Sequence, residues 1–165
     1  MANRVKLLPT IGGEIPYHDF TAHIGATAAE SALLTDLDAG KALKMAVAGL
    51  PDSRFEICAD GDEIQAMLQT IEPEQTSAGF KIGTVRSVKT MLHTGQVAVG
   101  ATLELGDEVV AAAQAAPGVP NNPAPRHVRM LVKKAPDETG TRLKVVAFQS
   151  GTGAAGSVVT LSQMF

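Results

Sequence analysis

The sequence predicts a mainly β protein: a small β-sandwich or β-barrel of short antiparallel strands, with an extended N-terminal arm and at most one or two short helices. Short runs rich in Val, Ile, Leu and Thr recur at roughly 8–12-residue spacing between glycine turns. The chain has 16 glycines but only 4% aromatic residues, so its core is expected to consist of Val, Leu, Ile and Ala. Proline and glycine break every regular pattern near the N-terminus. We therefore divide the chain into an arm, 1–25, and a β-rich domain, 26–165.

Composition excludes several classes of protein. The 165 residues are 45% hydrophobic and 19% charged, which is typical of one globular domain. The net charge is -3 and the basic residues are scattered, so a nucleic-acid partner is not expected. Cys58 is the single cysteine, which rules out an intrachain disulfide. No apolar run approaches the ~20 residues of a membrane span, and the N-terminus lacks a signal-peptide core. We expect a soluble product made in the cytoplasm.

The arm combines breaks with apolar side chains. Pro9, Pro16 and the pair Gly12-Gly13 prevent a continuous helix or strand. Apolar residues nevertheless recur at Leu7, Leu8, Ile11, Ile15, Tyr17, Phe20 and Ile24. Because such residues favour contact with other apolar surface, we expect the arm to lie on its own domain or on a partner.

The best helix candidate covers residues 27–37. Thr27 is a good N-cap, and Glu30 stands three residues later, as in a capping box. Gly40 ends the pattern. The run 41–47 that follows is predicted to be a strand.

The next two runs, 54–59 and 63–71, flank the dipeptide Asp60-Gly61. This dipeptide is a strong signal for a β-hairpin. The second run also fits a helical stripe of apolar residues. We favour a strand, because the Asp-Gly turn predicts that the second run pairs with the first.

Beyond Gly79 the sequence has the composition of a many-stranded sheet protein. Four short runs are predicted to be strands: 84–88, 96–99, 101–105 and 108–111. The stretch 117–125 is rich in Pro and Asn, so it is predicted to be a surface loop.

The pattern Gly-x-Gly-x-x-Gly occurs at Gly151, Gly153 and Gly156. Dinucleotide binding requires these glycines between a strand and a helix, with an acidic residue about 20 positions further on. Only nine residues follow Gly156, and none of them is acidic. The flanking runs 143–148 and 157–165 resemble strands, so we predict a strand, a glycine-rich turn and a closing strand. The turn either packs tightly against a neighbour or is a flexible loop.

No pattern of residues predicts catalysis or metal binding. The four histidines are not joined by the Cys or Glu residues of a common metal motif; they are His18, His23, His93 and His127. His18 and His23 are five residues apart in a segment without helical regularity, so we interpret them as polar residues of the arm. The sequence therefore predicts no cofactor and no metal.

An acidic cluster and the cysteine have equally simple explanations. Asp60, Asp62 and Glu63 resemble part of a calcium loop, but Met67 stands where the bidentate glutamate would be needed. We predict an acidic hairpin tip instead. Cys58 lies in an apolar strand-like run, where a free cysteine is usually a small core residue. No Gly-x-Ser-x-Gly motif is present to activate a serine.

The order of several segments resembles the capsid decoration, or head cement, proteins of tailed bacteriophages. The resemblance covers roughly residues 38–165 and rests on a succession of motifs: Gly40-Lys41-Ala42-Leu43, Asp60-Gly61-Asp62-Glu63, Gly79-Phe80-Lys81-Ile82-Gly83, Gly106-Asp107-Glu108-Val109-Val110-Ala111 and the terminal glycine turn. It implies a small β-rich domain that forms trimers or dimers outside the head and clamps adjacent capsid subunits after expansion. It implies no catalytic residues.

We therefore expect a structural virion protein on the outer capsid surface that stabilises the expanded capsid. Its partners would be the phage major capsid protein and further copies of itself, with a trimer favoured and a dimer possible. Nucleic acid and membranes are not expected partners. The capsid or partner contact would come from the arm residues Leu7, Leu8, Ile11, Tyr17 and Phe20. Alternatives are a tail or fibre-base module, or a small ligand-binding β-barrel with a convergent polar pocket.

Overall fold

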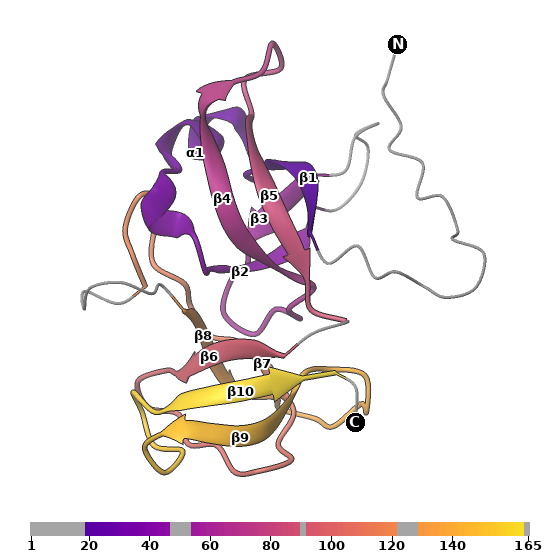
Figure 1. Cartoon of the computed structure of the whole chain (residues 1–165), viewed down its shortest axis with the longest axis vertical. Helices are drawn as coiled ribbons and strands as arrows, with labels where there is room; N and C mark the ends of the chain where they lie inside the picture. Colours follow the sequence, from indigo (N-terminus) through magenta and orange to yellow (C-terminus); the bar gives the residue numbers. More distant parts are fainter. Residues whose placement is uncertain (1–18, 47–53, 90–91, 122–128, 164–165) are drawn as a thin grey trace, which may run out of the picture.

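The computed structural model describes residues 19–46, 54–89, 92–121 and 129–163, and it is mainly β, as predicted. A barrel built from the first half of the chain lies above a second sheet built from the other half (Figure 1). In the described residues one short helix, α1 (Ala28–Leu33), and one 3-10 helix, η1 (Asp36–Asp38), lie beside the barrel (Figure 1).

The barrel contains five strands in the order β1-β3-β2-β4-β5, with β5 pairing back onto β1. Their bounds are β1 (Asp19–Ile24), β2 (Ala42–Met45), β3 (Arg54–Ile57), β4 (Ala66–Gln75) and β5 (Lys81–Ser87). The longest antiparallel pairings join β5 to β1 and to β4, and the middle of β5 alternates between buried and half-buried side chains. This alternation is what a sheet with one face on a core requires.

The second sheet has the strand order β7-β8-β6-β10-β9. The bounds are β6 (His93–Val97), β7 (Val109–Ala111), β8 (Met130–Lys134), β9 (Lys144–Ser150) and β10 (Val158–Ser162). Its outer strands also approach each other, because Val145 N–H donates to the Asp107 carbonyl at 3.0 Å and Val109 N–H donates to the Leu143 carbonyl at 2.9 Å. These bonds satisfy backbone groups that an open sheet edge would expose.

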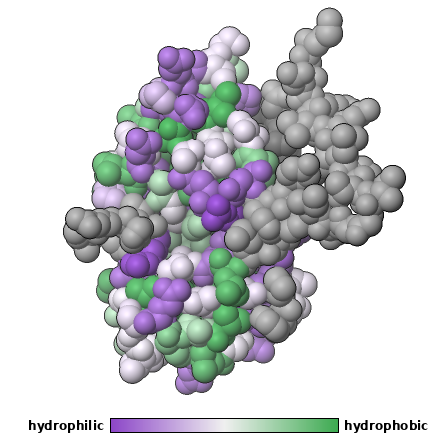
Figure 2. Space-filling view, in the orientation of Figure 1, coloured by the Kyte–Doolittle hydropathy of each residue, from purple (hydrophilic) through white to green (hydrophobic). Residues whose placement is uncertain are grey.

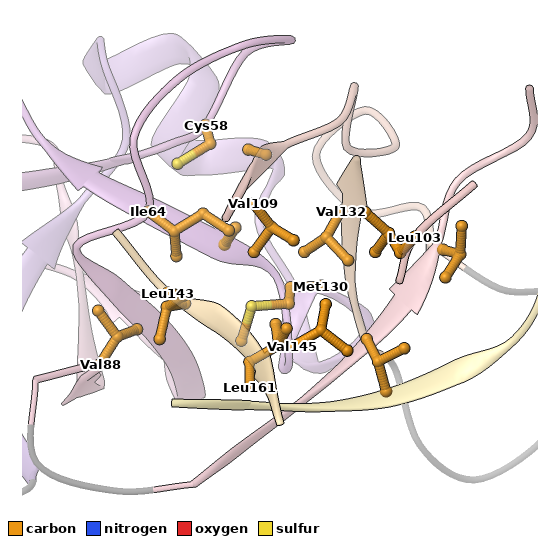
Figure 3. Close-up of a cluster of buried hydrophobic side chains, with 14 residues drawn as sticks. Cys58, Ile64, Val88, Leu103, Val109, Met130, Val132, Leu143, Val145 and Leu161 are labelled. Carbon is orange, nitrogen blue, oxygen red and sulfur yellow. The ribbon is translucent and has the colours of Figure 1, made fainter. Parts of the chain in front are cut away.

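One hydrophobic cluster joins the two halves (Figure 3). The segments next to barrel strands contribute Cys58, Ile64 and Val88, which pack with side chains of the second sheet. A separate cluster fills the barrel, including Ile24, Leu43, Phe55, Leu68 and Val85. The shared cluster means that the second sheet and the barrel bury apolar surface against each other.

The sheets are mixed rather than wholly antiparallel, which corrects the prediction. β1 runs parallel to β3, and β6 runs parallel to β8. β1 itself occupies residues that the sequence assigned to the arm, because its alternate side chains Ala22 and Ile24 enter the barrel core. β8 was not predicted at all.

The helix predicted over 27–37 is interrupted. α1 covers Ala28–Leu33 and η1 covers Asp36–Asp38. Thr27 accepts a bond from the Glu30 N–H at 3.1 Å, as predicted for the N-cap. The interruption arises because Leu34 is extended and Thr35 caps η1 in a new capping box with Asp38.

The hairpin predicted at Asp60-Gly61 is wrong. β3 pairs with β1 and β2, and β2 stands between β3 and β4 in the barrel. The turn instead packs against the second sheet, because Gly61 N–H donates to the Ala111 carbonyl at 2.8 Å and Ala111 N–H donates to the Asp62 carbonyl at 2.9 Å. The strand interpretation of 63–71 is confirmed for Ala66 onward.

Most remaining strand predictions overlap a strand, with shifted ends. The exception is 101–105, which forms no strand, because its backbone bonds go singly to different partners, such as Leu103 N–H to the Gly153 carbonyl. The loop prediction holds for 117–121, and 122–125 lies outside the described residues. The predicted final pair of strands is confirmed as β9 and β10, which are antiparallel.

The glycine-rich turn packs tightly. Gly153 is buried with φ +89°, and a β-carbon there would lie 2.0 Å from the Leu103 carbonyl oxygen. Its N–H donates to Ser157 Oγ at 3.1 Å. Of the two interpretations left open by the sequence, the close-packed turn is therefore the correct one.

Candidate partner-binding surface

The structure describes one of the five predicted contact residues. Phe20 lies in β1, where its ring is half-buried and lies 5.5 Å from the ring of Phe55 between centroids. The other four lie outside the described residues: Leu7, Leu8, Ile11 and Tyr17.

Helix α1 presents its apolar side chains to solvent and buries a polar one. Ser31 is its only buried residue, and its Oγ accepts a bond from the Lys81 N–H at 2.7 Å. Leu33 is 62% exposed, and Ala29 and Ala32 on the same face are also exposed. A helix that lies on a core normally has the opposite arrangement. This face is therefore free to contact another surface.

Two neighbouring segments extend this apolar surface. Leu37 of η1 and Val119 of the loop 115–119 are each 50% exposed. The loop contacts α1 so closely that a β-carbon on Gly118 would lie 2.8 Å from the Leu33 carbonyl oxygen. We define the apolar platform as the exposed side chains of these segments: Ala29, Ala32, Leu33, Leu37 and Val119. Figure 2 shows hydrophobic residues on the side of the upper half where α1 and η1 lie in Figure 1.

A buried ion pair holds the platform together. Lys41 and Asp38 are both fully buried, and Nζ lies 2.6 Å from Oδ1. The Lys41 ammonium also donates to the carbonyls of Ala115 and Ala116, at 2.8 and 2.9 Å. Its three protons are thus directed at three acceptors, which is what a buried ammonium requires.

Asp38 completes the connection to the loop. Its Oδ2 accepts bonds from the Gly118 N–H at 2.9 Å and the Thr35 N–H at 2.7 Å. One carboxylate therefore joins the start of η1, the loop and Lys41. Because these bonds lie in the interior, they fix the relative positions of the platform's segments more firmly than exposed bonds would.

The border of the platform is mainly acidic. Asp36 is exposed, and Glu30 is half-buried, with Oε2 accepting a bond from the Ala26 N–H at 3.0 Å. The nearby ammonium of Lys81 is directed at the Leu34 carbonyl, 2.6 Å away. An apolar surface with two carboxylates at its edge suits an apolar partner that carries positive charge.

A separate cleft of about 500 Å³ lies between the two halves of the molecule. Its described lining has two arginines and no carboxylate: Ala39, Gly40, Met67, Leu68, Gln69, Arg86, Leu92, His93, Thr94, Arg129 and Gln149. Arg86 makes a bidentate ion pair with Asp19, at 2.7 and 2.9 Å, and this hydrogen bonding raises the pKa of Arg86. The described lining of the cleft therefore mixes polar and apolar side chains, and Asp19 balances the charge of Arg86.

The structure also places the histidines and acidic residues considered above. His23 lies in β1 and the buried His93 begins β6, while His18 and His127 lie outside the described residues. Within the described ranges, no group of three or more His, Cys, Asp or Glu side chains is arranged to hold a metal. Asp60 and Asp62 pair with Lys133 and Lys44, respectively.

Cys58 is a core residue, and we expect its thiol to be unreactive in the folded protein. Burial, followed by the negative charge of Asp62, raises its pKa to about 12. At pH 8 the thiol is therefore protonated, and the thiolate is the species that alkylating reagents attack. Iodoacetamide should label the native protein slowly and the guanidinium-unfolded protein rapidly, as measured by mass spectrometry. Rapid stoichiometric labelling of the native protein would contradict this expectation.

Comparison with protein-family models, curated proteins and solved structures found no match to this chain. In the ranges that the structure describes, no helix has the length and apolar character needed to span a membrane.

Proposed function

We propose that this chain is a structural virion protein that binds the outer surface of a phage head and cements adjacent major capsid subunits. It stabilises the expanded capsid by binding, without catalysis. The protein is made in the host cytoplasm and acts on the virion, where it is present as a trimer or, second in preference, a dimer. The order of sequence motifs over 38–165 carries the resemblance on which this proposal depends.

The observation that best supports a binding function is the apolar platform. Leu33, Leu37 and Val119 are large apolar side chains exposed on segments that a buried ion pair fixes in place. Such preorganisation lowers the entropy cost of association. An exposed apolar surface on a soluble domain is characteristic of protein–protein contact.

The mainly β fold suits a clamp between subunits. Shared core packing and cross-connections such as Gly61 to Ala111 join the barrel and the second sheet. A stable contact of standard size buries ~1,600 Å², and repeated contacts on a symmetric shell add avidity. The arm residues Leu7, Leu8, Ile11, Tyr17 and Phe20 are proposed to contribute apolar contact to a capsid or protein partner.

Purified protein and phage heads that lack it provide the test. The full-length chain should saturate expanded heads, bind unexpanded heads weakly, and raise the temperature at which expanded heads release DNA. A truncation that begins at Asp19 should bind less well, because it lacks the arm but keeps β1 intact. Deleting Phe20 as well would confuse the result, since Phe20 pairs with Val85 in the barrel.

The same measurements separate the alternatives. A tail or fibre-base module would be found at the tail by cryo-electron microscopy and would not saturate tail-less heads. A small ligand-binding β-barrel would bind neither particle. Either result, with correctly folded protein, would overturn the proposed function.

A further inference from the structure

We propose that the apolar platform of one copy binds the arm of a second copy, with residues 4–11 as the bound segment. Copies of this chain would associate through this contact. It can be tested on purified protein without capsids, so its outcome is independent of the capsid proposal.

The platform is a surface that a partner is needed to cover. α1 buries Ser31 and exposes Leu33, although the reverse arrangement would bury more apolar area within the chain. The Lys41–Asp38 pair keeps the loop 115–119 beside this helix. The two features together hold an apolar surface in a fixed shape outside the core.

The arm has the chemistry of a matching ligand. Its apolar residues Leu7, Leu8 and Ile11 follow Arg4 and Lys6. Residues 1–18 contain one acidic side chain, Glu14, so the segment is basic overall. The border of the platform has the opposite charge, from the exposed Asp36 and the half-buried Glu30. Apolar residues would thus cover the platform while the preceding basic residues face its acidic border.

The geometry favours a second copy over the same chain. β1 runs from Asp19 toward α1, so the arm joins the end of β1 that is remote from the helix. In Figure 1 this end of β1 and the helix lie on opposite sides of the barrel. From Asp19, the segment back to Leu8 spans at most ~40 Å when extended, which is enough to reach a neighbouring molecule.

This mode of association is compatible with a closed ring. The arm and the platform are different surfaces, so each copy donates one contact and receives another. Three copies arranged around a three-fold axis would satisfy every arm and every platform. A reciprocal two-fold dimer, in which each arm lies on the other copy's platform, satisfies them as well, so this contact suits either the trimer or the dimer.

Complementation between two full-length variants tests the proposal. Leu7→Glu/Leu8→Glu alters only the arm, and Leu33→Glu/Leu37→Glu alters only exposed platform residues. Each variant alone should sediment as a monomer, with a dissociation constant for self-association at least ~10-fold above that of the wild type. Mixed together, they should form a heterodimer, because one variant retains the arm and the other retains the platform.

Val99→Glu is the matched control, since Val99 is 98% exposed in the turn after β6 and lies outside the platform. It should associate like the wild type. Thermal unfolding and circular dichroism establish that all variants are folded. Three results would overturn the proposal: the wild type is monomeric, the platform variant associates as well as the wild type, or the mixture stays monomeric. An arm that binds its own chain would leave the wild type monomeric.

Discussion

Replacing Lys41 with methionine should destabilise the protein by about 3–5 kcal/mol, because it leaves the Asp38 carboxylate buried without its counter-charge. The carbonyls of Ala115 and Ala116 lose their shared donor in the same step. Such a loss is a large fraction of the roughly 5–15 kcal/mol that stabilises most domains. At this chain length it corresponds to a fall in melting temperature of roughly 10 °C.

Lys44→Met is the control for this effect. Lys44 also pairs with carboxylates, Asp62 at 2.8 Å and Glu56 at 3.3 Å, but it is 28% exposed. Losing partly solvated pairs should cost under ~1 kcal/mol. Urea unfolding of both variants measures the difference, and hydrogen exchange of the Gly118 amide, which donates to Asp38, localises it. Equal losses of stability in the two variants would contradict a special role for the buried pair.

Local composition predicted the strands better than their partners. The runs that became β5, β7 and β9 were recognisable from β-branched residues between glycine turns. Pairing depends on contacts remote in sequence, and the Asp60-Gly61 turn illustrates the difference. Its local chemistry favours a hairpin, but its backbone hydrogen bonds with Ala111 attach the turn to the second sheet instead. The parallel pairs β1–β3 and β6–β8 have no local signal at all.

The sequence did not predict the apolar platform either, because its exposure also depends on the tertiary structure. Ala29, Leu33 and Leu37 recur at four-residue intervals, a pattern that normally marks the buried face of a helix. The break at Leu34 and the capping of η1 by Thr35 change the directions of these side chains. Hydrophobic periodicity identifies residues that favour contact, but it does not show whether the contact is with the same chain or with a partner.

The terminal glycine pattern forms a tight turn between two strands. Gly151, Gly153 and Gly156 all have positive φ, between +76° and +89°. They form a turn between β9 and β10, and no helix follows in the described residues. The spacing that resembles a nucleotide-binding fingerprint therefore reflects backbone requirements of a tight turn against Leu103.

Gly153→Ala should be one of the most damaging single-methyl changes in the chain. The new β-carbon would lie 2.0 Å from the Leu103 carbonyl oxygen, so the backbone of one segment has to move. That movement breaks the 2.9 Å bond from the Leu103 N–H to the Gly153 carbonyl. Overpacking and left-handed strain together should reduce the free energy of unfolding by about 3–5 kcal/mol, as measured by urea denaturation.

Gly100→Ala separates the two contributions. Gly100 has φ +81°, close to that of Gly153, but a β-carbon there meets no atom within 4 Å. It should therefore suffer only the backbone strain, about 1–2 kcal/mol. The difference in the free energy of unfolding between the two variants isolates the contact with Leu103. If the Gly153→Ala protein cannot be recovered folded while the Gly100→Ala protein folds normally, the conclusion is the same. If the two alanines cost the same, the turn is not packed against residue 103 in solution, and the buried contact that joins the β9–β10 turn to the segment 101–105 does not form.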